Sequence, residues 1–195
     1  MAYTDFNWII DRLAVGGFVR DSDDLPFDAI LSMETHAPTL LRDLVRSGRV
    51  EYQWRSILDG RCDEENDEIV RRFDAAAAQM DAWLRGGRRV LVHCFAGVSR
   101  SVTAVIWYLM RYRGYSWEQA LELIKANRPG AYPDVRFEIP LRLAAGEDLS
   151  EEWIEGRIEA YCAGLRAMGW ERDPSEIWEA LEQQGTFRRE RAAAG

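Results

Sequence analysis

Residues 90–101 read VLVHCFAGVSRS. This stretch opens with a continuous apolar run, which is typical of a short strand buried inside a sheet. Cys94 follows the run, and Gly97 lets the backbone curl without a Cβ clash. From residue 99 onward the sequence turns helical as far as Gly114. The stretch therefore predicts a buried strand, a tight loop and a helix that begins where the loop ends.

Strand and helix signals alternate on both sides of this stretch. Upstream, β-forming runs predict two short strands within 8–19, which meet at the turn Asp11–Arg12, and further strands at 28–33 and 50–58. Helical spacing of apolar residues predicts helices at 39–48, 66–85, 116–128 and 133–145. This alternation predicts an α/β fold in which helices flank a central, mostly parallel sheet.

The C-terminal residues are expected to form a separate part of the fold. We expect residues 1–146 to form the α/β domain and residues 147–195 to form a two-helix extension packed on it. The first helix of the extension carries an apolar stripe formed by Ile154, Ile158, Tyr161, Leu165 and Met168. The second begins with Asp173 as its N-cap, followed by Pro174.

Composition excludes several classes of function. The 195 residues include 33 acidic and 25 basic side chains, a net charge of −8 that disfavours nucleic-acid binding. No apolar run approaches the length of about 20 residues that spans a bilayer, and the N-terminus lacks a secretion signal, so we expect a cytoplasmic protein without a membrane partner. Three cysteines and two histidines match no disulfide framework and no structural zinc site. We expect no metal or organic cofactor, and the sequence leaves the oligomeric state open.

The loop after the strand combines groups that suit phosphate chemistry. Backbone N–H groups of such a loop can form an anion-binding nest at the start of the helix. A helix N-terminus and a basic neighbour favour a thiolate, so Cys94 is expected to be nucleophilic. Arg100 offers a planar fork of donors that matches two phosphate oxygens, and Ser99 and Ser101 add hydroxyl groups. Together these groups predict covalent phosphoryl transfer through a phosphocysteine.

The arrangement His93-Cys94-x5-Arg100-Ser101, with its AGVSRS segment, resembles the signature loop of cysteine-based protein phosphatases, and specifically their dual-specificity subgroup. The resemblance implies a protein-tyrosine-phosphatase-like fold over about residues 6–140 and a two-step mechanism without a cofactor. It also implies roles for two neighbours of the nucleophile: His93 positions Cys94, and the Ser101 hydroxyl helps the thiolate leave in the second step. The expected phosphate-binding residues are Phe95, Ala96, Gly97, Val98, Ser99 and Arg100.

The resembled family also uses an aspartic acid about thirty residues before the cysteine as general acid, and then as general base. Asp59 and Asp63 both lie at a suitable separation from Cys94. We favour Asp59, because it directly follows the apolar strand at 50–58 and so has a fixed position. The acids that follow it resemble a solvated face and the first turn of a helix. The choice between Asp59 and Asp63 stays open at this point.

The expected substrate is a phosphorylated protein that carries phosphotyrosine or phosphoserine/threonine. The loop contains no lysine, which disfavours polyphosphorylated lipids and RNA 5′-ends. The same chemistry on a small phosphorylated metabolite, lipid or nucleotide is the first alternative, and a phosphate-binding module without turnover is the second. A sulfurtransferase would also use a loop cysteine, but the five-residue gap to Arg100 fits a phosphatase better.

Overall fold

The structure is a computed structural model that describes residues 5–19, 25–35, 45–57 and 66–186. It divides into two compact units. The first lies within the segments Met1–Asp59 and Arg71–Pro133, and the second within Gly60–Val70 and Asp134–Gly195. The expected domain boundary near residue 146 and the packing of residues 147–195 on the domain stay predictions.

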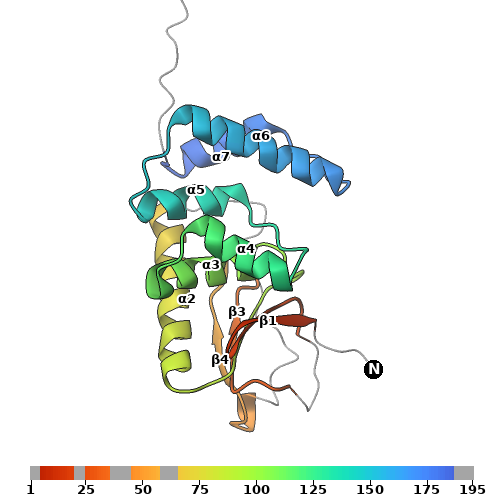
Figure 1. Ribbon diagram of the computed structural model, residues 1–195, viewed down its shortest axis with the longest axis vertical. Coiled ribbons are helices and arrows are strands. Elements are labelled where there is room, and N and C mark those ends of the chain that lie inside the picture. Colours follow the sequence, from red (N-terminus) through yellow and green to blue (C-terminus); the bar gives the residue numbers. More distant parts are fainter. Residues whose placement is uncertain (1–4, 20–24, 36–44, 58–65, 187–195) are drawn as a thin grey trace, which may run out of the picture. The chain divides into compact units, whose positions relative to one another are not determined.

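The first unit is built on a sheet whose described strands run in the order β1-β2-β5-β3-β4. Strands β1, β3 and β4 are labelled in Figure 1. The strands are β1 (Phe6–Ile10), β2 (Leu13–Gly16), β3 (Ala29–Ser32), β4 (Glu51–Trp54) and β5 (Val90–His93). Strands β1 and β2 pair antiparallel, whereas β2 with β5, β5 with β3 and β3 with β4 pair parallel. The predicted mostly parallel sheet is therefore confirmed. Because β5 is the central strand, the chain leaves it at the middle of the carboxyl edge.

The core explains why β5 reads as a continuous apolar run. Ala14, Leu91 and Ile30 face one another across three strands, and they form one buried cluster with Val19 and Phe27. Val90 and Val92, which alternate with Leu91 along the strand, are also fully buried. Both faces of β5 are thus covered, as expected for a strand inside a parallel sheet.

Three helices support the sheet. Helix α3 (Arg100–Arg113) packs against β2 and β5, and α4 (Trp117–Asn127) contacts α3 and β1. Helix α2 (Asn66–Arg85) accepts a hydrogen bond from the Trp107 indole of α3 at Asp74, over 2.9 Å. Ser116 and Gln119 form the predicted capping box at the start of α4. These bounds confirm the helices predicted at 66–85, 99–113 and 116–128.

Two predictions upstream meet the structure only in part. The strand predicted at 50–58 is shorter, because it ends at Trp54. Most of the helix predicted at 39–48 lies outside the described residues, although residues 45 and 46 are helical.

The second unit contains α5 (Val135–Ala144), α6 (Glu151–Ala167) and α7 (Pro174–Gln183), which pack on one another. Asp173 caps α7 by accepting from the Ser175 N–H, as predicted. The apolar stripe on α6 is buried at Ile154, Ile158 and Tyr161, but Met168 lies past the helix and is half exposed. Within the described ranges, no helix is both long and apolar enough to cross a membrane.

Candidate active site

Cys94 lies at the end of the central strand and at the start of the loop that leads into α3. Its side chain is buried, with 2% of the residue exposed. The Cys94 N–H donates to the Gly16 carbonyl over 3.3 Å, and the preceding carbonyl of His93 accepts from the Met33 N–H over 2.8 Å. The backbone at the cysteine is therefore fixed by hydrogen bonds to the ends of both neighbouring strands.

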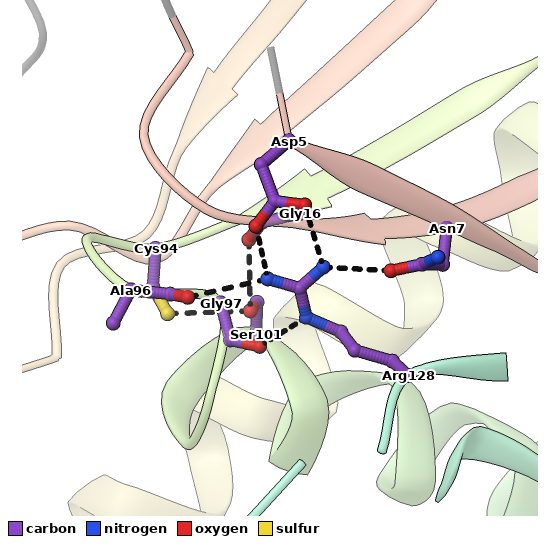
Figure 2. A network of polar contacts seen from close by, with 8 residues as sticks. All are labelled: Asp5, Asn7, Gly16, Cys94, Ala96, Gly97, Ser101 and Arg128. Carbon is purple, nitrogen blue, oxygen red and sulfur yellow. Dashed lines mark hydrogen bonds and ion pairs between the residues drawn. The ribbon is translucent and has the colours of Figure 1, made fainter. Parts of the chain in front are cut away.

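Ser101 is a close polar neighbour of the thiol (Figure 2). Its Oγ lies 3.2 Å from the Cys94 Sγ and donates to the Gly16 carbonyl over 3.3 Å. A hydroxyl carries only one proton. When Cys94 is a thiol it can donate to Ser101, and when Cys94 is a thiolate the Ser101 hydroxyl can turn and donate to sulfur. The proximity of Ser101 and Cys94 that the proposed role requires is thus present in the fold.

The loop carbonyls are held by donors that lie outside the loop. The carbonyl of Phe95 accepts from the Phe18 N–H over 2.8 Å, and that of Val98 accepts from the Tyr132 N–H over 2.8 Å. The two carbonyls between them, those of Ala96 and Gly97, accept from Arg128 over 3.2 and 2.6 Å (Figure 2).

This pattern sets the direction of the loop N–H groups. In a planar trans peptide the N–H points opposite to the carbonyl of the same plane, and the described chain holds no cis peptide bond. The N–H groups of residues 96–99 therefore point away from the four outside donors. The first turn of α3 contains no acidic residue, and the Ser99 side chain makes no capping bond to it. Such a loop at a helix N-terminus favours an anion.

Gly97 is the residue that allows this loop to form. Its φ is +66°, in the left-handed region that favours glycine. A Cβ at this position would lie 2.5 Å from Arg128 Nη2 and 2.6 Å from both the Gly16 carbonyl carbon and the Gly17 nitrogen. The tight loop expected from the sequence is confirmed, and the structure adds a close contact with the end of β2.

Arg100 begins α3 and is 3% exposed. Its Nη1 donates to Thr35 Oγ1 over 3.1 Å and approaches the carbonyls of Met33 and Ile57 at 3.4 and 3.3 Å. These acceptors follow β3 and β4, so the guanidinium is anchored at the carboxyl edge of the sheet. Its expected contact with a phosphate stays a prediction.

His93 is fully buried at the end of β5. Burial lowers the pKa of His93 to about 4; a contact with the Cys94 backbone opposes this shift and the nearby Arg100 charge adds to it. The imidazole is therefore neutral at neutral pH. A neutral buried ring beside the cysteine supports a positioning role and disfavours a role as an acid.

The loop, its nucleophile and the surrounding fold match a known family. The family model described as the dual specificity phosphatase catalytic domain matches residues 18–145. The chain belongs to the dual specificity phosphatase family.

Two relatives and one solved structure illustrate this relationship. Dual specificity protein phosphatase 15 of Mus musculus is 56% identical over 134 residues, which are 66% of this chain and 53% of that protein. Dual specificity protein phosphatase 22 of Homo sapiens is 33% identical over 141 residues, 70% of this chain and 71% of that protein. A crystal structure of DUSP15 has a TM-score of 0.59 at 28% identity and covers 72% of this chain and 87% of that one. The chain spans less than half the length of two Arabidopsis thaliana relatives that it matches.

Some of the expected residues of this dual specificity phosphatase lie outside the described part. Asp59 and Asp63, the two candidates for the general acid, both do, so the choice between them stays open. Cys162, for which the sequence predicts no chemical role, is buried on α6. Within the described ranges, no group of three or more His, Cys, Asp or Glu side chains is placed to hold a metal ion.

The residues outside the phosphatase loop that hold it in place could not be identified from the sequence. The sequence marks Arg128 only as the end of a helix and Gly16–Gly17 only as the end of a strand. No local pattern links position 128 to position 97, because the contact exists only in the folded chain. The parallel pairing of β2 with β5 sets Gly16 beside His93, next to the start of the loop.

Proposed function

We propose that this chain hydrolyses phosphate monoesters of proteins, on phosphotyrosine and on phosphoserine/threonine, through a phosphocysteine intermediate. The observation that carries the proposal is the Cys94 thiol at the start of a loop whose four carbonyls are all held from outside. That arrangement turns a series of N–H donors to the opposite side. A nucleophile beside preorganised donors is the arrangement that acyl- and phosphoryl-transfer enzymes use.

In the first step, the Cys94 thiolate attacks phosphorus in line with the leaving oxygen. The sulfur–phosphorus bond forms as the phosphorus–oxygen bond to the substrate breaks. Loop N–H groups of residues 95–100 and the Arg100 guanidinium hold the three remaining oxygens while charge develops on them. Asp59, in its protonated form, gives a proton to the departing alcohol or phenol.

In the second step, water attacks the phosphocysteine and inorganic phosphate leaves. The Asp59 carboxylate accepts a proton from this water, and the sulfur–phosphorus bond breaks. Ser101, whose Oγ lies 3.2 Å from Sγ, donates to the departing thiolate. His93 stays neutral and holds the strand end in position. No metal or organic cofactor takes part in either step.

The substrate class follows from the surface beside the nucleophile and from the family. Phe95 is 67% exposed and packs edge-on against Phe18, with ring centroids 6.3 Å apart. An exposed aromatic pair beside a loop whose sequence contains no lysine suits the side chain of a phosphorylated protein better than a polyphosphate. The relatives are named as protein phosphatases, which supports the same class. Because the mechanism needs a reduced thiol, we propose a cytoplasmic location.

Hydrolysis of an aryl phosphate, measured with a reductant and a metal chelator present, tests the reaction. Wild-type protein is expected to turn over, and Cys94→Ser to fall to background. Cys162→Ser is the matched control, because it removes a second buried cysteine that lies on α6. Full activity in Cys94→Ser would contradict the mechanism.

A substrate panel then tests the class. Phosphotyrosine and phosphothreonine peptides are expected to be hydrolysed better than nucleotide, inositol or sugar phosphates. A clear preference for one of the small phosphates would move the assignment to the metabolite alternative. Binding of phosphopeptides without any turnover would favour the phosphate-binding module.

A further inference from the structure

Arg128 uses every N–H group that it has, two on carbonyls of the active-site loop and three on the side chains of Asp5 and Asn7. A guanidinium carries five N–H donors. Nε donates to the Gly97 carbonyl over 2.6 Å, and Nη2 donates to the Ala96 carbonyl and to Asp5 over 3.2 and 2.7 Å. Nη1 donates to Asn7 over 2.8 Å and to Asp5 over 3.3 Å. Figure 2 shows the guanidinium between the loop and the side chains of Asp5 and Asn7.

We propose that Arg128 is a positioning residue for phosphoryl transfer, which fixes the loop N–H groups through the Ala96 and Gly97 carbonyls and is itself oriented by Asp5 and Asn7. The proposal rests on the proposed function for its consequence in catalysis. It extends that function to a cluster of residues far from Cys94 in sequence.

The direction of the peptide planes is the first support for this role. Since the Ala96 and Gly97 carbonyls point at Arg128, the N–H groups in the same planes, those of Gly97 and Val98, point away from it. Without Arg128 these two peptide planes would lose the donors that set their orientation. The other two loop carbonyls keep their backbone donors, Phe18 and Tyr132. Arg128 therefore controls the middle of the loop.

Charge balance is the second support. The Arg128 side chain is only 9% exposed, whereas that of Asp5 is 70% exposed. The hydrogen bond from Arg128 lowers the pKa of the Asp5 carboxyl, so Asp5 stays ionised at neutral pH. Asp5 neutralises the charge of the Arg128 guanidinium, which also donates to the loop carbonyls. Arg100 remains the cation expected to meet the phosphate.

Geometry explains why lysine cannot replace this arginine. An ammonium group has three donors that radiate from one atom, and they cannot make the five hydrogen bonds of the planar guanidinium. The loop also leaves no spare room, because a Cβ at Gly97 would lie 2.5 Å from Nη2. Arg128→Lys therefore keeps the charge but loses the orientation of the two carbonyls.

The test measures an anion at the loop without needing turnover. Inorganic phosphate is used to protect Cys94 from alkylation by iodoacetamide, and the Cys94-containing peptide is quantified by mass spectrometry. The half-protecting phosphate concentration is compared for wild type, Arg128→Lys and Asp5→Asn, each relative to its own rate without phosphate. The matched control is Arg89→Lys. Arg89 also pairs with an aspartate, because its Nε and Nη2 donate to Asp28, both over 3.1 Å. It lies just before the first residue of β5, whereas Cys94 follows the last.

In Arg128→Lys the half-protecting concentration is expected to rise by about tenfold or more, which corresponds to the loss of one good donor interaction. Asp5→Asn is expected to cause a smaller rise, since Arg128 keeps its contacts with Asn7 and the loop. The half-protecting phosphate concentration of Arg89→Lys should equal that of wild type. The thermal midpoints of the two arginine variants should be similar, so that the difference in protection reports position and not folding.

Equal phosphate protection in Arg128→Lys, Arg89→Lys and wild type would overturn the proposal, as would a wild type that phosphate does not protect. If phosphate protects wild-type Cys94 and Arg128→Lys weakens this protection, but aryl phosphate is not hydrolysed, the proposed function fails while the role of Arg128 in fixing the loop N–H groups stands. If Arg128→Lys does not fold, Asp5→Asn decides: its rise supports the proposal, and an unchanged value contradicts it.

Discussion

The Cys94 Sγ lies 3.2 Å from the Ser101 Oγ, and the two residues stand at opposite ends of the loop, one at its start and one in the first turn of α3. The Gly16 carbonyl, 3.3 Å from the same hydroxyl, gives its proton an alternative acceptor. The serine can therefore serve a thiol and a thiolate without moving its backbone.

Replacement of Ser101 by alanine is expected to slow the second step more than the first. A hydrogen bond to a charged group is worth about 1.5–3 kcal/mol, so release of the thiolate should slow by about 10- to 100-fold. Rapid-mixing kinetics with an aryl phosphate should then show a burst of phenol followed by slow turnover. Ser116→Ala, which removes the remote cap of α4, is the control. Equal slowing of burst and turnover would argue against this role for Ser101.

Gly97→Ala is expected to impair both stability and activity. A residue other than glycine in the left-handed region costs about 1–3 kcal/mol, and overpacking adds about 1–3 kcal/mol. Gly114→Ala separates the two causes, because Gly114 has a φ of +72° and a Cβ there would meet no described residue other than its chain neighbours within 4 Å. Urea unfolding should show a larger loss for Gly97→Ala than for Gly114→Ala. Similar losses would mean that the contact with β2 and Arg128 has no energetic effect.

The lowered pKa of His93 is expected to make the free energy of unfolding depend on pH in the acid range. Its pKa is lowered to about 4 in the folded protein, against about 6.5 when unfolded. Between these values the unfolded chain binds the extra proton, so the free energy of unfolding falls as the pH decreases from 6.5 to 4. This shift lowers the free energy of unfolding by about 3 kcal/mol once the pH has fallen to 4. In His93→Asn this part of the pH dependence should disappear; an unchanged slope between pH 6.5 and 4 would contradict the buried neutral state.

The general acid can be identified from the pH dependence of kcat. If Asp59 donates the proton, the rate falls at higher pH as its carboxyl ionises, and Asp59→Ala removes this limb. Affinity for phosphate should stay close to that of wild type in this variant. Asp63→Ala is the paired measurement, and loss of the limb there instead would assign the role to Asp63.

Much of the fold follows from local pattern. The solid apolar run of β5, the capping box of α4 and the apolar stripe of α2 each indicate an element and its buried side. The loop chemistry also follows, because Cys94, Gly97, Arg100 and Ser101 are close in sequence as well as in space.

Contacts that only folding creates could not be predicted in this way. Arg128 reaches Gly97 from the end of another helix, and Asp5 reaches Arg128 from the start of β1. The anchoring of Arg100 by the carbonyls after β3 and β4 is of the same kind. The buried stripe predicted to include Met168 is wrong at that residue, because α6 ends before it and leaves the side chain half exposed.

The phosphocysteine intermediate can be trapped directly. Wild-type protein is mixed with an aryl phosphate, quenched in acid within the first turnover and digested, and the peptides are mapped by mass spectrometry. We predict one phosphoryl group on the Cys94-containing peptide, and none on that peptide in Cys94→Ser. Phenol release in a burst without phosphate on Cys94, or with phosphate on another residue, would contradict a phosphocysteine mechanism.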